Sequence, residues 1–137
     1  MSAASAPYNP FRKDSDLVWY PVGASTKIYA GTMVCTRTDG YAYPARSGTS
    51  TDVFLGVAYE TVDNSSGAAG ALPIRVQKEG TYLYGTTGAA QSNVGKSLYA
   101  SDDNDVTLTS TNNQLIGTCV EFISATQVRV RIDNAVN

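Results

Sequence analysis

Acidic side chains are the residues of this sequence whose types and spacing could do chemistry. Asp102, Asp103, Asn104 and Asp105 follow one another, and such carboxylate and amide oxygens are the ligands that Ca²⁺ prefers. A helix–loop–helix calcium site, however, alternates its ligands around a central glycine and ends in a distal glutamate, which this run does not. Because the run stands between two predicted strands, we interpret it as a solvated turn. We predict no metal site and no cofactor.

A pair of glutamates could support a second chemistry, the hydrolysis of glycosidic bonds by two carboxyl groups. Glu60 and Glu121 are the candidates, but Trp19 is the only tryptophan, so no aromatic sugar cleft is visible. The sequence has no histidine, which removes the commonest general base and transition-metal ligand. The glycine-rich stretches 67–70 and 85–88 lack the lysine and the following helix of a phosphate loop. We predict no enzymatic activity, and a small polysaccharide hydrolase is the enzymatic alternative.

Composition and charge narrow the classes of partner. The chain has 137 residues, which fits one domain, and its hydrophobic content of 42% is that of a globular protein. Charged residues make up only 16%, so the surface must consist largely of small polar side chains that suit packing against other protein. A net charge of −2 without a basic run argues against nucleic acid as a partner. No apolar run approaches the roughly 20 residues of a membrane span, and no secretion signal is visible, so we expect synthesis in a cytoplasm.

From residue 17 onward the sequence predicts short strands separated by turns. Runs of β-branched and aromatic residues alternate with polar ones, and Asp39-Gly40 between two such runs predicts a hairpin with a type I′ turn. Pro21 indicates an edge strand or a bend, and Gly56 predicts a bulge or a close backbone approach. No window shows helical periodicity. The expected fold is therefore all-β, either a small β-barrel or a tulip-like sandwich.

Cysteine and tyrosine carry the remaining compositional signals. Cys35 and Cys119 are too few and too distant for a metal site, and each lies in an apolar predicted strand. We interpret both as small buried side chains; a disulfide is the alternative. The nine tyrosines against three phenylalanines indicate that part of the surface is a protein interface.

Three blocks of the sequence recur in the same order, which predicts two related β units. The spacing between matching blocks changes only across loops. Gly56 and Gly117 would occupy equivalent positions, as would Glu60 and Glu121. The matching blocks are Gly31–Val34 with Gly95–Leu98, Leu55–Glu60 with Ile116–Glu121, and Ile74–Val76 with Val128–Val130. We expect a single β domain over residues 17–137, with the internal repeat at 31–78 and 95–132.

Residues 1–16 differ in composition from the rest of the chain and predict an extended, flexible N-terminal arm. Pro7 and Pro10 favour extended or polyproline geometry and exclude a helix. We hypothesise that the arm docks on a neighbouring protein, and a terminus without a role is the alternative. The residues expected to make that contact are Tyr8, Pro10, Phe11, Arg12 and Lys13.

The stretch LGVAYETVDNSSGAAG at 55–70, followed by Ile74-Arg-Val and Gly80, resembles the small capsid cement or decoration proteins of tailed bacteriophages. The similarity continues through GKSLYASDDND at 95–105 and the closing strands over 115–132. These motifs are packing and turn patterns rather than catalytic signatures.

The resemblance implies a β-barrel or tulip-like domain that binds the outside of an assembled head and stabilises the shell. The implied partners are the major capsid protein and two further copies in a homotrimer, and the implied location is the outer surface of the virion. A carbohydrate- or receptor-binding β module of a phage tail or surface fibre is the alternative.

Overall fold

A computed structural model of the chain describes residues 5–7 and 16–133. The second range folds into twelve strands and one short 3₁₀ turn, η1 (Gln91–Asn93). The strands form two five-stranded sheets and one two-stranded sheet, with antiparallel pairing in every ladder. The prediction of an all-β fold is therefore confirmed. No helix in the described ranges is long and apolar enough to cross a membrane.

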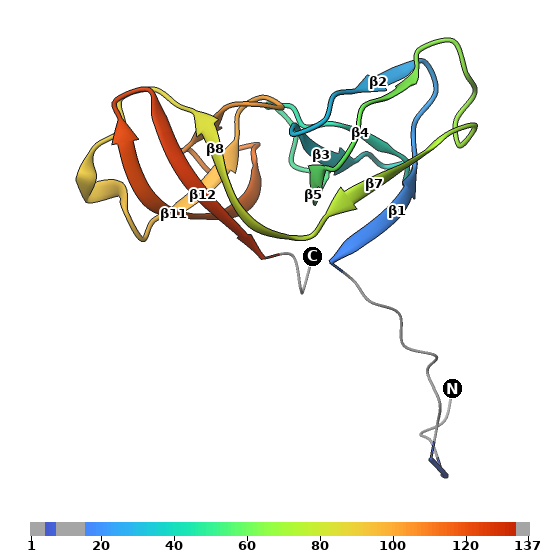
Figure 1. The fold of residues 1–137 in the computed structure, drawn as a ribbon, viewed down its shortest axis with the longest axis horizontal. Helices are drawn as coiled ribbons and strands as arrows, with labels where there is room; N and C mark the ends of the chain where they lie inside the picture. Colours follow the sequence, from blue (N-terminus) through green and yellow to red (C-terminus); the bar gives the residue numbers. More distant parts are fainter. Residues whose placement is uncertain (1–4, 8–15, 134–137) are drawn as a thin grey trace.

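The two larger sheets lie in opposite halves of the molecule, and β7 leads directly into β8 to join them (Figure 1). The first sheet has the order β1 (Leu17–Pro21), β7 (Pro73–Gln77), β5 (Val53–Ala58), β3 (Met33–Thr36) and β4 (Ala42–Pro44). The second sheet has the order β8 (Glu79–Gly85), β12 (Gln127–Asp133), β11 (Gln114–Ser124), β9 (Ser97–Ala100) and β10 (Val106–Thr107). The two-stranded sheet consists of β2 (Thr26–Ile28) and β6 (Val62–Asn64).

The two five-stranded sheets have the same topology, strand for strand. Each has a β-bulge at the same place, where the register skips Leu55 in β5 and Ile116 in β11. A glycine follows each skipped residue. A Cβ on Gly56 would lie 2.1 Å from the carbonyl oxygen of Gln77, and one on Gly117 would lie 2.0 Å from that of Arg131. The bulge and close backbone approach predicted at Gly56 are thus confirmed.

Neither five-stranded sheet closes into a barrel, so that alternative was wrong. The edge strands of each sheet meet only through one isolated bridge, Val22 with Ala42 in the first sheet and Gly85 with Asp105 in the second. The strands that would have to complete the ladder, β4 and β10, have three and two residues. β1 is an edge strand, as Pro21 indicated, because proline has no N–H to donate to a further strand.

Two apolar clusters form the core. One lies between the first sheet and the two-stranded sheet and includes Ile74 of β7 and Ile28 of β2. The other fills the second sheet and also takes in Met33, Phe54 and Val57 from the first sheet. β3 and β5 are consequently buried on both faces, which explains why their sequences are almost continuously apolar. Each such side chain contributes about 1.5–3 kcal/mol when fully buried.

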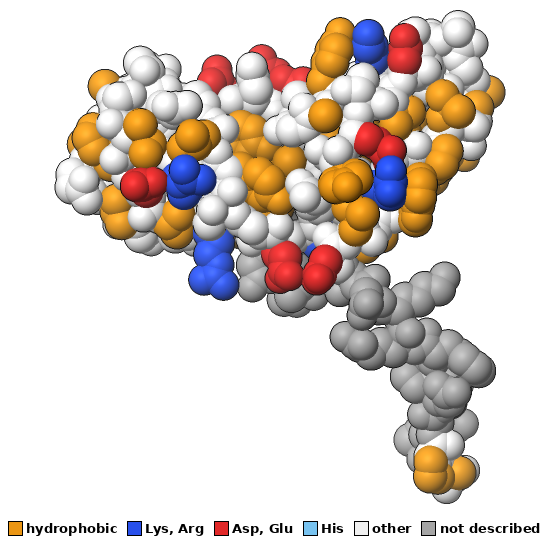
Figure 2. Space-filling view, viewed as in Figure 1, with side chains coloured by type: hydrophobic (Ala, Val, Ile, Leu, Met, Phe, Trp, Pro, Cys, Tyr) orange, Lys and Arg blue, Asp and Glu red, His pale blue; other side chains and the backbone are white. Residues whose placement is uncertain are grey.

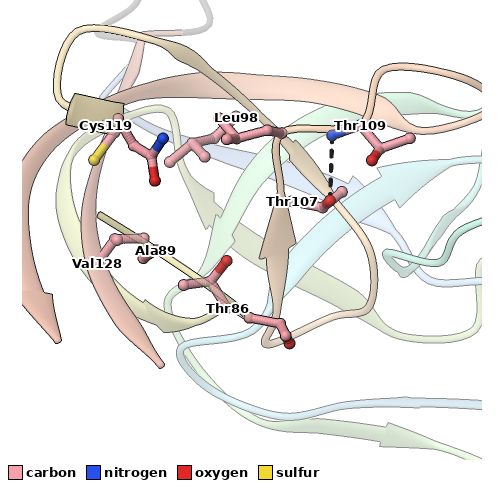
Figure 3. A pocket seen from close by; sticks show the side chains of 10 residues that line it. Thr86, Ala89, Leu98, Thr107, Thr109, Cys119 and Val128 are labelled. Atoms are coloured by element: carbon pink, nitrogen blue, oxygen red, sulfur yellow. Dashed lines mark hydrogen bonds between the residues drawn. The ribbon is translucent and has the colours of Figure 1, made fainter. Parts of the chain in front are cut away.

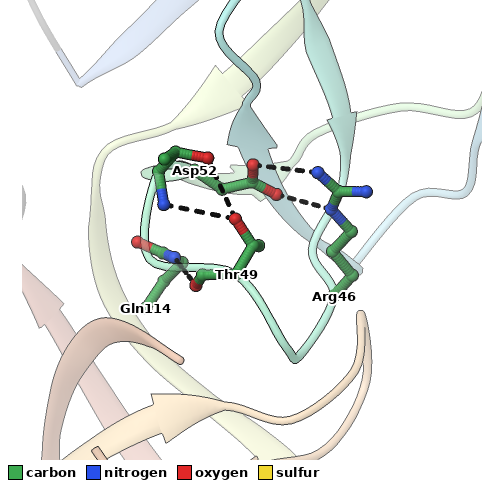
Figure 4. Close-up of polar contacts among 5 residues, drawn as sticks. Arg46, Thr49, Asp52 and Gln114 are labelled. Carbon is green, nitrogen blue, oxygen red and sulfur yellow. Dashed lines mark hydrogen bonds and ion pairs between the residues drawn. The ribbon is translucent and has the colours of Figure 1, made fainter. Parts of the chain in front are cut away.

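Two hydrogen bonds hold the loop between β4 and β5 against the second sheet, and an ion pair within the loop fixes its shape (Figure 4). Asp52 is buried and accepts hydrogen bonds from Arg46 Nε at 2.8 Å and Nη2 at 3.2 Å. Gln114 of β11 donates its Nε2 hydrogen to the Thr49 carbonyl at 2.8 Å, and the Thr49 N–H donates to the carbonyl of Asn112 at 2.9 Å. The two hydrogen bonds of Thr49 complement the shared apolar cluster in joining the two sheets.

The predicted hairpin at Asp39-Gly40 is present between β3 and β4, but its turn is not type I′. Gly40 has a φ of 81°, whereas Asp39 is not among the described residues with positive φ. The Asp39 carboxylate instead accepts hydrogen bonds from the Tyr41 N–H at 3.0 Å and the Tyr43 hydroxyl at 2.6 Å. An aspartate that bonds the backbone two residues onward stabilises a wider loop, which covers 37–41 here.

Both cysteines are buried and free, as predicted, and no disulfide joins them. Burial raises the pKa of the Cys35 thiol to about 12, with the nearby Asp52 carboxylate as the second cause. The Cys35 thiol is therefore protonated at neutral pH and unreactive.

Candidate docking surface

An exposed cluster of aromatic and charged residues lies on the outer face of the first sheet. Arg75 is central in it because Ile74 and Val76 on either side point into the core, and alternate residues of a strand face opposite ways. Trp19 of β1 pairs with Arg75 across the β1–β7 ladder. On the other side, the Tyr59 N–H donates to the Arg75 carbonyl at 2.9 Å. The sheet thus places a tryptophan and a tyrosine on the two sides of one arginine.

The guanidinium group of Arg75 lies between the two rings. Its central carbon is 5.0 Å from the centre of the Trp19 ring and 4.9 Å from the centre of the Tyr59 ring. Such cation–π contacts are worth about 0.5–1 kcal/mol each at exposed sites. Trp19 and Tyr59 remain 59% and 50% exposed. At least half of the surface of each residue is therefore available to another molecule.

Glu60 fixes the arginine in this position. Arg75 donates from Nε to Glu60 Oε2 at 2.9 Å and from Nη2 to Oε1 at 3.0 Å, and its backbone N–H also donates to Oε2 at 3.0 Å. A bidentate arginine–carboxylate pair is among the most geometrically specific polar contacts in proteins. We call Trp19, Tyr59, Glu60 and Arg75 the aromatic–arginine cluster.

The second sheet repeats this arrangement without the aromatic rings. Arg129 donates from Nε to Glu121 Oε1 at 3.0 Å. Leu83 pairs with Arg129 across the β12–β8 ladder, and Val120 precedes Glu121, so two aliphatic residues take the places of the tryptophan and the tyrosine. Figure 2 shows a basic side chain beside an acidic one over each half of the molecule, with hydrophobic side chains around both. The first sheet therefore carries the aromatic form of a surface that both sheets share.

The cluster has the composition and rigidity of a protein-binding surface. Tryptophan, tyrosine and arginine are the residue types that dominate binding energy at protein interfaces. Glu60 balances the charge of Arg75, so the cluster does not select a polyanion such as nucleic acid. Because the contacts above already hold the side chains in place, binding costs them little conformational entropy.

The two glutamates considered for glycoside hydrolysis are each paired with an arginine of their own sheet. Hydrogen bonds from the Arg75 side chain and backbone lower the pKa of Glu60 below its ordinary value of 4.5. A general acid for glycoside hydrolysis needs a raised pKa instead. Each glutamate instead holds the arginine of its own sheet in position.

The lowered pKa of Glu60 predicts an acid-dependent change that Trp19, the only tryptophan, reports by its emission. A carboxylate with a lowered folded-state pKa stabilises the fold at pH values above its unfolded pKa, and this contribution is lost as the pH falls through the lowered value. We expect constant emission between pH 8 and pH 5 and a change below about 4.5. Glu60→Gln should abolish that change, and Glu121→Gln should retain it. A transition near pH 6, or one that persists in Glu60→Gln, would contradict the ion pair.

The residues singled out from the sequence fall in several places. Asp102 to Asp105 form the turn between β9 and β10, and no cluster within 5–7 and 16–133 has the three or more ligands that could hold a metal. The aromatic–arginine cluster was not predicted. The residues expected to bind a partner, Tyr8, Pro10, Phe11, Arg12 and Lys13, lie outside the described residues.

Exposed tryptophan and tyrosine beside an arginine are typical of a surface that contacts other proteins. A family model described as phage cement protein matches residues 13–133. The chain therefore belongs to the phage cement protein family, as its resemblance to that family predicted. Membership supports a structural, capsid-stabilising role and a location on the phage capsid. Comparisons with curated proteins and with solved structures give no match.

Proposed function

We propose that this protein binds the outer surface of the assembled phage head through the major capsid protein and stabilises the shell without catalysing a reaction. The observation that carries the proposal beyond family membership is the aromatic–arginine cluster, in which Trp19 and Tyr59 stay exposed while Arg75 is held in place. A surface of this kind gains affinity when a partner covers it.

Stabilisation of the shell follows from linkage. A protein that binds the assembled lattice and not its dispersed subunits shifts the equilibrium toward the lattice by RT ln(1 + [L]/Kd) at each site. The shift is summed over many sites on one head. Association into a homotrimer adds avidity, because three weak contacts to neighbouring shell subunits act together.

The test is to titrate the purified protein into heads that lack it. Saturable binding at a fixed ratio to the shell subunits is expected. Absence of binding to heads, together with specific binding to glycans on an array, would overturn the proposal in favour of a carbohydrate- or receptor-binding module, for which exposed aromatic rings are also suitable.

Deletion of residues 2–13 tests the proposed role of the arm. We expect the truncated protein to remain folded, because β1 begins at Leu17. Its affinity for heads should fall at least tenfold, since Tyr8 and Phe11 are the bulky apolar residues that an extended segment could anchor. Equal binding and equal protection of heads by both proteins would show that the arm has no part in docking.

We also propose that the domain over 17–137 contains two copies of one β unit. The matching strand order, the matching bulges and the two glutamate–arginine pairs support this origin. On this proposal, one copy kept an aliphatic surface and the other acquired the aromatic residues used for docking.

A further inference from the structure

A cavity of about 220 Å³ lies beside the second sheet. Its apolar floor is formed by Leu98, Cys119 and Val128, which are all buried. Threonines line much of the remainder, and Figure 3 shows Thr86, Thr107 and other side chains grouped around the space. An apolar floor with a polar rim is typical of a site for one apolar group carried on a polar segment.

The corresponding place in the first sheet is filled by the chain itself. Val34, Ala58 and Ile74 occupy the positions of the three floor residues and belong to one buried cluster with Ile28. Ile28 is fully buried and is carried by β2, an extended strand. Between β8 and β9 the second half has only a loop and η1, so no strand supplies a counterpart of Ile28. The cavity lies where that side chain would be.

We propose that this cavity receives the Phe11 side chain from the arm of a second copy of the chain. A dry cavity of about 150 Å³ is enough to bind benzene, so a phenyl ring fits the larger space here. Tyr8 and Phe11 are the only aromatic side chains in residues 1–16. Phenylalanine suits an apolar floor better, because a buried tyrosine needs a partner for its hydroxyl group.

Charge complementarity supports the same occupant. Arg12 and Lys13 follow Phe11 directly. The acidic run at 102–105 immediately precedes β10, whose Thr107 lines the cavity, and Asp105 forms a bridge with Gly85, the neighbour of Thr86. A phenylalanine inserted in the cavity would thus bring two basic residues near an acidic turn.

The position of the arm indicates that the occupant comes from another copy. Phe11 lies six positions before Leu17, where β1 begins, and such a segment spans at most about 20 Å when extended. Leu17 pairs with Gln77 at the junction of the two sheets, and from there β8 runs over Glu79–Gly85 before Thr86 reaches the cavity, which is about 23 Å of extended strand. An arm that passes from each copy to the next makes a head-to-tail contact, which closes into a ring when the rotation allows. The inference extends the proposed function by giving the arm a partner within the assembly.

Two complementary variants of the full chain test the inference. Phe11→Ser removes the inserted side chain and keeps the cavity, whereas Ala89→Leu fills the cavity and keeps the arm. By sedimentation, the wild type should self-associate, and each variant alone should associate at least tenfold more weakly. A mixture of the two should form a one-to-one complex, because one supplies an arm and the other a cavity. Self-association of Phe11→Ser at the wild-type level, or a mixture that does not pair, would overturn the proposal.

A second measurement applies if Ala89→Leu unfolds the protein. A synthetic peptide of residues 5–13 is added to the full-length Phe11→Ser protein, and the methyl signals of Leu98 and Val128 are followed by NMR. Saturable shifts of these signals are expected, and a peptide that carries the same Phe11→Ser change should shift them at least tenfold less strongly. Unchanged signals would overturn the inference.

Binding to heads is measured in a separate experiment. If the copies associate through the arm as expected but do not bind heads, the result would count against the proposed function and not against this inference.

Discussion

Trp19→Ala should weaken binding to assembled heads by about 30-fold, with the melting temperature of the free protein almost unchanged. Truncation of an interface hot spot costs about 2 kcal/mol or more, and each 1.4 kcal/mol is a factor of ten in affinity. Trp19 is 59% exposed on an edge strand, so its loss removes little buried surface from the free protein. Co-sedimentation of labelled protein with heads that lack it measures the change.

The second sheet provides the matched control for this variant. Leu83 occupies the place of Trp19 beside an equivalent glutamate–arginine pair and is 43% exposed. Leu83→Ala should therefore change head binding by less than about threefold, since an aliphatic residue outside the contact contributes little. Equal losses in Trp19→Ala and Leu83→Ala, or no loss in either, would refute the assignment of docking to the aromatic–arginine cluster.

Gly56→Ala should cost the protein about 4 kcal/mol or more of its free energy of unfolding, which is a large part of the 5–15 kcal/mol typical of a domain. Gly56 has a φ of 148°, and a Cβ there would lie 2.1 Å from the Gln77 carbonyl oxygen, which is backbone and cannot move aside alone. Gly117→Ala should behave similarly, because its Cβ would lie 2.0 Å from the Arg131 carbonyl oxygen. The midpoint of urea unfolding measures the loss, and failure to fold is its extreme form.

Gly40→Ala is the control for backbone conformation without a clash. Gly40 has a φ of 81°, and nothing lies within 4 Å of the added Cβ, so the cost is that of a left-handed residue, about 1–2 kcal/mol. If Gly56→Ala and Gly40→Ala lost the same free energy of unfolding, the backbone of β5 at Gly56 would not lie too close to β7 for a Cβ atom, contrary to the structure.

Much of the fold was predictable because local patterns decide it. The alternation in β7 predicts Ile74 and Val76 inward and Arg75 outward, and the structure agrees. Gly56 within an apolar strand marks a bulge for the same local reason. Barrel closure was not predictable, because it depends on how many residues β4 and β10 contribute to a ladder with distant edge strands. The turn type at Asp39 depended on side-chain hydrogen bonds that compete with the tight turn.

The candidate docking surface was harder to predict than the fold. Its residues come from β1, β7 and the bend that follows β5, and only the sheet register brings Trp19 beside Arg75. One signal was available in the sequence: Glu60 and Glu121 match in the repeated blocks, and so do Arg75 and Arg129. A glutamate and an arginine that recur together in both β units indicate that the two side chains form an ion pair in each unit. Aromatic neighbours occur beside the pair in the first unit only, which indicates that this unit alone carries the docking surface. The role of the arm remains a prediction.

The temperature at which heads release their genome tests the central claim most directly. Heads that lack the protein are heated after addition of increasing amounts of wild type or Trp19→Ala. The proposed function predicts a release temperature that rises with wild-type concentration and levels off at a fixed ratio to the shell subunits, with about 30-fold more Trp19→Ala needed for the same shift. Saturable binding of the wild type without any rise in release temperature would contradict it.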